Sequence, residues 1–418
     1  MMKFLHAADV HIDSPLRGLE RYPGAPVDVL RGATRRAFEN LIELAISQQV
    51  RFVILAGDLF DGPWQDMQTG IWTAQQFRKL QQHDIPVYLL RGNHDAESLV
   101  QQHIRWPDNV HQFGTSEATS FWLDDVSVGI HGQGFAQRET RDNLVAAYPE
   151  VRSGWLNIGV LHTSLTGNTD HDVYAPVALE QLVGKGYQYW ALGHIHQRQV
   201  VHEFPHVVFP GNLQGRHIRE VGAKGCCIVE CSGTEVAQVH FHAIDTLRWQ
   251  RVVVEARAEH DVGDLVTVIR EQLQAAGGET DNRYRAVRIE VRGACVAHQR
   301  LSHPDQDDAF RAELRNVANE VDALTWVEKI VRDTSPAIDI DAVRRQPGLL
   351  GELLRDADAL QTDEDRLRKL TEDFDDLARK AQLELSEAGI DLTDPQRVRR
   401  WLRDAETLLL TELLEADA

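Results

Sequence analysis

The stretch RFVILAGDLFDG, residues 51–62, joins a short apolar run to two acidic side chains, Asp58 and Asp61. An apolar run of this length that ends at a polar cluster predicts a strand. Apolar residues at helical spacing occupy about 30–49 before it and 66–83 after it. Strands that alternate with helices in this way predict an α/β fold.

The same pattern recurs along the first 245 residues. Helices separate the early strand-like runs, whereas the later runs follow each other closely. An α/β beginning therefore passes into a more β-rich half. Strands are expected at 3–8, 51–56, 86–90, 126–130, 157–161, 188–192, 207–209, 225–231 and 235–243.

A second arrangement of elements begins near residue 246. Its pattern predicts strands at 249–256, 284–293 and 324–332, with helices at 262–276 and 306–320. Because no Gly/Ser-rich linker precedes this small α/β unit, we expect it to pack on the first domain. The expected domains are 1–245, 246–335 and 336–418.

The last of these domains is expected to be helical. It has two apolar stripes at 3/4 spacing, over 367–385 and 398–413, with a turn at 389–394 between them. Thr393 and Gln396 have the spacing of a capping box. The two helices either pack back on the 246–335 unit or dock a partner protein, and the pattern allows both.

Composition excludes several classes of protein. The chain has 418 residues, of which 43% are apolar and 26% charged, which argues against a disordered or collagen-like protein. No apolar run approaches the ~18 residues of a membrane span, and His6, Asp9 and His11 interrupt the N-terminal stretch, so we expect neither a signal peptide nor membrane association. Four cysteines without disulfide or CxxC spacing indicate reduced core thiols in a cytoplasmic protein.

The net charge of −20 at first argues against a nucleic-acid substrate, because phosphate binding normally relies on lysine and arginine. The charge is unevenly distributed, however. Residues 336–418 carry 21 acidic and 12 basic residues, a net of −9. A site built from carboxylates and imidazoles also becomes positive once divalent metals fill it.

Five polar clusters share one placement, directly after a strand-like run, where the loops of an α/β fold converge. Residues two apart in an extended segment point to the same side, so Asp-x-His and His-x-His can each offer two ligands to one metal. Carboxylates and imidazoles without thiolates favour manganese, iron or zinc. The clusters are Asp9-Val-His11, Gly57-Asp58-Leu-Phe-Asp61, Gly92-Asn93-His94-Asp95, His162 in GVLHTS, and Gly193-His194-Ile-His196.

Each cluster alone has an ordinary explanation. A lone His-x-His is usually a surface pair, GNHD alone is a tight loop that uses Gly and Asn to reach positive φ, and His162 alone is a histidine at the edge of the core. Arg216 and His217 either touch substrate phosphate or lie on a solvated loop. The metal site is indicated by the five clusters together, each at a strand end.

Together the motifs resemble the signature of the calcineurin-like metallophosphoesterases. The opening FLHAADVHIDSPL and the stretch PGNLQGRHIRE, 210–220, are similar to the SbcD/YhaO-type DNA repair exonucleases of that superfamily. The resemblance is strong over residues 1 to about 245, extends to 246–335 and is loose in the tail. It implies a four-layer α/β/β/α sandwich with a small α/β capping domain and a C-terminal helical tail.

The family pattern also implies roles for the motif residues. His94 would be the non-ligand histidine that faces the scissile phosphate. Asp61 stands where some archaeal and eukaryotic relatives carry a histidine, so it would instead orient a neighbouring ligand from the second shell. Asp95, like Asp61, Arg216 and His217, would support the site or contact substrate. One metal would be held by Asp9, His11 and His196, the other by Asn93, His162 and His194, and Asp58 would bridge both.

By resemblance, the activity is that of a manganese-dependent 3′ to 5′ DNA exonuclease that uses a metal-activated water, with single-strand endonuclease activity as an open addition. The partner would be an SMC-like ATPase of the SbcC/YhaN type, and a homodimer also stays open. Two other hypotheses keep the fold: a phosphodiesterase or phosphoprotein phosphatase for small substrates, and a non-catalytic scaffold. The tail and capping unit argue against the first, and the complete ligand set argues against the second.

Overall fold

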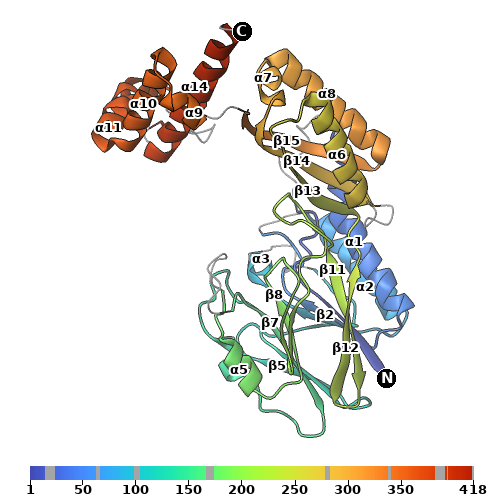
Figure 1. Cartoon of the computed structure of the whole chain (residues 1–418). Helices are drawn as coiled ribbons and strands as arrows, with labels where there is room; N and C mark the ends of the chain where they lie inside the picture. Colours follow the sequence, from blue (N-terminus) through green and yellow to red (C-terminus); the bar gives the residue numbers. More distant parts are fainter. Residues whose placement is uncertain are drawn as a thin grey trace. The chain divides into compact units, whose positions relative to one another are not determined.

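The computed structural model describes residues 1–14, 24–62, 66–97, 104–165, 174–277, 283–337, 340–381, 391–392 and 394–416 (Figure 1). The chain forms two compact units. The first contains Met1–Arg251, Gly277–Arg288 and Asp322–Lys329, and the second contains Val252–Ala276, Ile289–Val321 and Ile330–Ala418.

The first sheet of the first unit has six strands in the order β12-β11-β1-β2-β3-β4. Strands β1 to β4 run parallel, so their carboxyl ends meet at one edge of the sheet. Strand β11 pairs antiparallel with β1, and β12 with β11. The strands are β1 (Met2–Ala7), β2 (Val53–Ala56), β3 (Val87–Leu90), β4 (Val110–Gln112), β11 (Gly225–Ser232) and β12 (Glu235–Ala243).

The second sheet also has six strands, in the order β5-β6-β7-β8-β10-β9. Its four central strands are parallel, and the two edge strands are antiparallel to their neighbours. The strands are β5 (Thr119–Leu123), β6 (Val128–Gly132), β7 (Leu156–His162), β8 (Tyr189–Gly193), β9 (Gln199–Glu203) and β10 (His206–Phe209).

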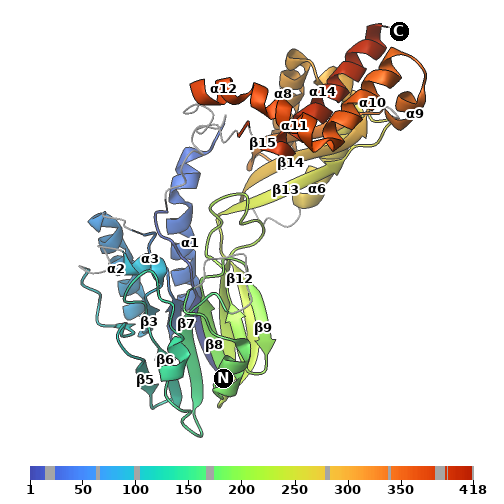
Figure 2. The same ribbon diagram turned by 90° about the vertical axis from the view of Figure 1, so that its left-hand side faces the viewer.

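Apolar side chains hold these elements in four layers, which lie side by side in Figure 1 from α5 to α1 and α2, while Figure 2 views them from the α5 side. Successive residues of β1 point to opposite faces, so Leu5 packs with α1 (Val27–Ser47) and α2 (Met67–Gln81), whereas Phe4 packs between the two sheets. On the far face, Leu182 of α5 (Leu179–Gly184) packs with Trp190 of β8. The expected α/β/β/α sandwich is therefore confirmed.

A separate sheet has the order β13-β14-β15. The strands and helices expected between 249 and 332 are confirmed to within a few residues. In the first unit, Trp249 and Trp326 of this sheet pack with Leu30 and Ala33 of α1. The elements are β13 (Leu247–Glu255), α6 (Val262–Gly277), β14 (Tyr284–Cys295), α7 (Ala297–Leu301), α8 (Pro304–Val321) and β15 (Thr325–Pro336).

The C-terminal region is helical, as expected, and α10 contacts α9, α11 and α14. The single helix expected from 367 is instead two helices that meet at Phe374. Thr393 and most of the expected turn lie outside the described residues. The helices are α9 (Ile340–Arg345), α10 (Leu349–Thr362), α11 (Glu364–Asp373), α12 (Asp375–Lys380) and α14 (Pro395–Ala416).

Two expectations from composition can be compared with the structure. Cys226, Cys227, Cys231 and Cys295 are all buried free thiols. Among the described residues, no helix combines the length and the apolarity that crossing a bilayer requires.

Candidate metal centre

The candidate ligands lie in the first unit, where the strands of both sheets end. They come from five loops that are far apart in the sequence. Asp9 and His11 follow β1, Asp58 follows β2, Asn93 and His94 begin the short helix α3 (Asn93–Ala96), His162 ends β7, and His194 and His196 follow β8.

Four of these residues have positive backbone φ angles: 50° at Asp9, 47° at His11, 53° at Asp58 and 102° at His194. Side-chain sterics disfavour this region, and residues held there cluster at functional sites. Backbone hydrogen bonds fix the loops after β1 and β2 side by side, because Asp9 N donates to Gly57 O and His11 N to Asp58 O, both at 3.0 Å. The strained conformations therefore bring Asp9, His11 and Asp58 together.

Gly92 allows the loop after β3 to approach the loop after β2, which carries Asp58. A Cβ atom on Gly92 would lie 2.2 Å from Asp58 Oδ1 and 2.7 Å from Asp58 N. The φ of Gly92 is an ordinary −87°, so this position requires space and not a left-handed backbone. The backbone N of His94 donates to Asp58 Oδ1 at 2.9 Å, which fixes the carboxylate between the two loops.

The donor atoms converge in three overlapping groups, each with its members within 4.8 Å of one another. The Nε2 atoms of His11 and His196 are 3.2 Å apart, and His162 Nε2 is 3.4 Å from Asp58 Oδ2. Two imidazole nitrogens at that distance need a shared proton or a cation between them, so these residues fit a metal site. The groups are Asp9–His11–His196, Asp9–Asp58–His162 and His11–Asp58–His94.

Asn93 and His194 lie beside these groups. Asn93 Oδ1 is 2.9 Å from His162 Nε2, and the ring centroids of His194 and His162 are 5.2 Å apart. The backbone N of His194 donates to Asp9 Oδ2 at 2.9 Å. The structure thus brings all the candidate ligands together, although the His194 ring is in none of the three groups.

Burial and neighbouring charges shift the pKa values of the histidines in the centre. Burial would lower the pKa of His162, but the charge of Asp58 and the contact with its carboxylate raise that pKa to about 9. Burial lowers the pKa of His11 to about 3, and Arg216 acts in the same direction. Because an imidazole must be deprotonated to bind a metal, a proton on His162 would be released when a cation enters.

Asp61 contacts both a candidate ligand and His94. Its Oδ1 is 3.3 Å from His11 Nδ1 and 3.0 Å from His94 Nδ1, and Ser14 Oγ donates to its Oδ2 at 2.7 Å. Burial opposes ionisation of Asp61, yet the hydrogen bonds of His11 and His94 hold its pKa well below the usual range. An ionised Asp61 can therefore orient both imidazole rings.

The surroundings of Asp95 indicate a structural role. Its carboxylate is fully buried and accepts hydrogen bonds from the backbone N atoms of Leu59 (3.2 Å), Phe60 (3.0 Å) and Gly92 (3.1 Å). These bonds join the loop after β2 to the loop after β3. Asp95 thus supports the position of Asp58 and lies too deep to contact substrate.

Arg216 and His217 lie at one side of the centre. Arg216 Nη2 is 3.3 Å from His196 Nδ1, and its Nη1 is 3.9 Å from Asp61 Oδ1. His217 is half exposed. Both also approach Glu220, a buried carboxylate that accepts from His196 at 2.7 Å and that the sequence motifs do not mark as a site residue. Glu220 ends the stretch PGNLQGRHIRE, but no spacing within that stretch indicates a contact with His196.

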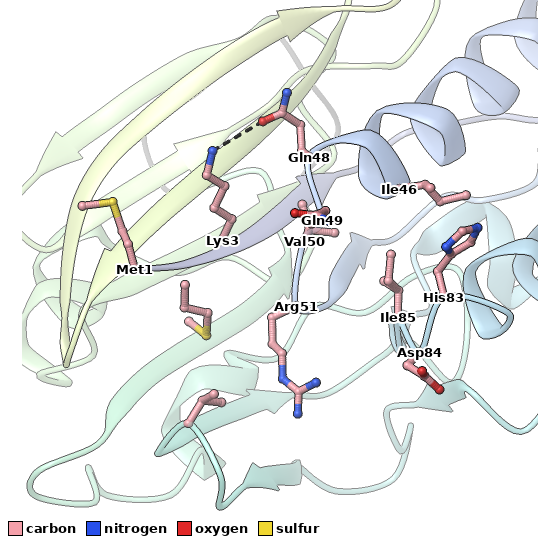
Figure 3. Close-up of a pocket in the computed structure, with 12 residues that line it drawn as sticks. Met1, Lys3, Ile46, Gln48, Gln49, Val50, Arg51, His83, Asp84 and Ile85 are labelled. Carbon is pink, nitrogen blue, oxygen red and sulfur yellow. Dashed lines mark hydrogen bonds between the residues drawn. The ribbon is translucent and has the colours of Figure 1, made fainter.

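A cavity of about 710 Å³ lies elsewhere in the first unit (Figure 3). Its lining includes Lys3, Gln48, Arg51 and Asp84, near the amino ends of β1 and β2, and Lys3 Nζ donates to Gln48 Oε1 at 3.4 Å. The candidate ligands follow the carboxyl ends of those strands. None of them lines this cavity, so its size gives no indication about the metal centre.

Fold and donors together define a metal-dependent phosphoesterase. The sequence matches calcineurin-like phosphoesterases over residues 2–198 and the middle domain of the metallophosphoesterase YhaO over 249–335. The chain belongs to the calcineurin-like phosphoesterase family.

Relatives of the chain include both uncharacterised and repair proteins. It is 34% identical to the uncharacterised metallophosphoesterase YhaO of Bacillus subtilis over 65% of this chain and 67% of that protein. It is 26% identical to the DNA double-strand break repair protein Mre11 of Sulfolobus acidocaldarius over 47% of this chain, and so spans half the length of that relative. A dimetal phosphatase of Danio rerio aligns with a TM-score of 0.31 at 12% identity, over 55% of this chain and 92% of that one.

Proposed function

We propose that this chain is a dimetal-dependent DNA nuclease, a 3′ to 5′ exonuclease with single-strand endonuclease activity. The convergence of buried His11, Asp58 and His162 with half-buried His196 is the observation that carries the hydrolytic part. The choice of DNA is supported by the similarity to Mre11 repair proteins and by the stretch 210–220.

In this proposal manganese is the metal, with iron and zinc as alternatives. Two such ions, when bound, would polarise a phosphodiester, lower the pKa of a water molecule and balance the developing charge. Asp9, His11 and His196 would hold one ion, Asn93, His162 and His194 would hold the other, and Asp58 would bridge them.

His94 is assigned to the reacting phosphate. Its side chain is 31% exposed, whereas those of His11 and His162 are at most 1% exposed, so His94 can be reached from solvent. Burial lowers the pKa of His94, but the hydrogen bond to Asp61 and the charge of Asp58 raise it above its ordinary value. A protonated His94 can stabilise negative charge on the phosphate or protonate the leaving oxygen.

The domain limits 1–245, 246–335 and 336–418 form part of the proposal. The tail would dock an SMC-like ATPase of the SbcC/YhaN type. In its support, Leu377 of α12 and Leu409 of α14 are 52% and 44% exposed, so both leucine side chains are available for a contact. The net charge of −9 favours a protein surface over DNA as its contact. A cytoplasmic location agrees with the free cysteines.

The test is digestion of end-labelled duplex, hairpin and single-stranded DNA with Mn, Mg or EDTA. We expect products that shorten from the 3′ end with Mn and no cleavage with EDTA. The Asp58→Asn variant, purified identically, controls for contaminating nucleases. Hydrolysis of bis(p-nitrophenyl) phosphate without cleavage of any DNA would favour a phosphodiesterase for small substrates. Failure to bind Mn, Fe or Zn would favour a scaffold.

A further inference from the structure

Glu220 is a buried carboxylate on the loop segment 212–224. It is 6% exposed, and its oxygens are within hydrogen-bonding distance of four donors. Oε1 lies 2.7 Å from His196 Nδ1 and accepts from Arg216 Nη2 at 3.2 Å. Oε2 accepts from Arg216 N at 2.7 Å and Asn212 Nδ2 at 3.0 Å. A carboxylate has about four lone-pair positions, so Glu220 is fully satisfied in one orientation.

These contacts decide which nitrogen of His196 carries the proton. Arg216 Nη2 is also 3.3 Å from His196 Nδ1, but a guanidinium has no acceptor, so the hydrogen on Nδ1 must go to Glu220. The lone pair of a neutral ring is then on Nε2. That atom is 3.2 Å from His11 Nε2 and 3.9 Å from Asp9 Oδ1.

Two further imidazoles of the centre, those of His162 and His11, have the same arrangement. His162 Nδ1 is 2.9 Å from Ala56 O, and His11 Nδ1 faces Asp61. In each case an acceptor lies on the Nδ1 side while Nε2 faces the shared donors. A partner of this kind fixes the tautomer of a metal-binding histidine and makes it more basic.

Glu220 itself is held rigidly. Lys224 Nζ and Asn212 N both donate to His196 O, at 2.8 and 3.3 Å. On the other side of the segment, Trp249 Nε1 donates to Gly215 O, and Gly222 N donates to Trp249 O, both at 3.0 Å. Because β13 and the His196 loop both bind the segment, its carboxylate cannot follow the ring if the ring turns.

We propose that Glu220 is a positioning residue for His196, which keeps the proton on Nδ1 and turns Nε2 toward Asp9 and His11. The inference rests on the metal centre of the proposed function but not on its DNA substrate. The competing explanation is that Glu220 only folds the 212–224 segment through Arg216 and Asn212.

The test compares Glu220→Gln with Glu328→Gln in the full chain. Glu328 is an equally buried glutamate, 4% exposed, that pairs with Arg288 at 2.6 and 2.8 Å. Mn affinity is measured by calorimetry, the ligand field by the visible spectrum of the Co-loaded protein, and folding by thermal unfolding in EDTA. Hydrolysis of bis(p-nitrophenyl) phosphate is followed against Mn concentration.

We expect Glu220→Gln to weaken Mn binding about 10- to 100-fold and to change the Co spectrum, with hydrolysis recovering toward the wild-type rate at saturating Mn. Glu328→Gln should match wild type in Mn affinity, in the Co spectrum and in hydrolysis. If Glu220→Gln does not fold, Glu220→Asp carries the test, because it keeps the charge and draws the carboxylate back from Nδ1.

A folded Glu220 variant with wild-type Mn affinity and Co spectrum overturns the inference, and so does a loss of hydrolysis that saturating Mn does not restore. If Glu220→Gln has the expected effect on Mn binding but the wild-type protein does not cut DNA, the nuclease proposal alone is refuted. Wild-type protein that binds neither Mn nor Co refutes both.

Discussion

Replacing Gly92 with alanine tests whether the position of Asp58 controls the centre. The new Cβ would lie 2.2 Å from Asp58 Oδ1 and 2.9 Å from its Cγ, whereas Cβ contacts below 3.0 Å are essentially never found. The carboxylate or the loop after β3 must therefore move by about 0.8 Å or more. The hydrogen bonds from His94 N to Asp58 and from Gly92 N to Asp95 resist that movement.

Two effects of Gly92→Ala can be estimated. Overpacking a tight site costs roughly 1–3 kcal/mol of folding free energy. A displacement near 1 Å in a catalytic group lowers activity by about 10²-fold. We therefore expect a modestly lower unfolding temperature, weaker Mn binding and a rate of bis(p-nitrophenyl) phosphate hydrolysis reduced about a hundredfold.

The matched control is Gly184→Ala. A Cβ at Gly184, in α5, meets no atom within 4 Å, and the backbone there needs no positive φ. Alanine should be neutral or stabilise by up to ~1 kcal/mol. A folded Gly92→Ala protein with wild-type Mn stoichiometry and rate would refute the argument that Gly92 provides space for Asp58.

Three other outcomes are expected. His94→Ala should keep both metals and lose nearly all hydrolysis, whereas Asp58→Ala should lose the metals as well as the hydrolysis. Equal metal content in the two variants, measured by elemental analysis, would contradict the role of His94. In EDTA, the pKa of His162 in the folded protein, about 9, exceeds its ordinary value of 6.5, so its contribution to the free energy of unfolding is present below about pH 6.5 and lost as the pH rises through 9. Urea titrations that show no such loss would argue against the His162–Asp58 pair. Truncation after residue 335 should keep Mn-dependent cleavage of single-stranded DNA and abolish co-purification with the ATPase; a truncated chain that aggregates but still binds the ATPase would place the docking surface elsewhere.

The central strands were predictable because they are buried on both faces and so appear as continuous apolar runs, as in VILA of β2. The strands β4, β5 and β9 were not predicted. They lie at sheet edges, and segments such as VHQ and QVVHE mix polar and apolar residues without a clear period.

The candidate ligands were predictable for a related reason. Each belongs to a short motif at a strand end, so sequence position alone brings Asp58 and Asn93 to the same edge. Glu220 lies in the stretch 210–220, but that stretch does not indicate a contact with His196, which depends on the fold of 212–224. The positive φ angles of Asp9 and His11 likewise result from tertiary hydrogen bonds that a local pattern does not encode.

The pairing of β1 with β11 has a consequence for the order of events during synthesis. β1 leads directly into Asp9 and His11, yet one of its neighbours in the sheet, β11, is formed by Gly225–Ser232. His196 and Glu220 also lie late in the sequence. A nascent chain that ends before about residue 232 therefore contains the first donor residues but not the whole of β11, which pairs with β1. Closing the long loop between these two strands is entropically costly. We therefore expect the complete set of donors to form only after residue 232 has been synthesised.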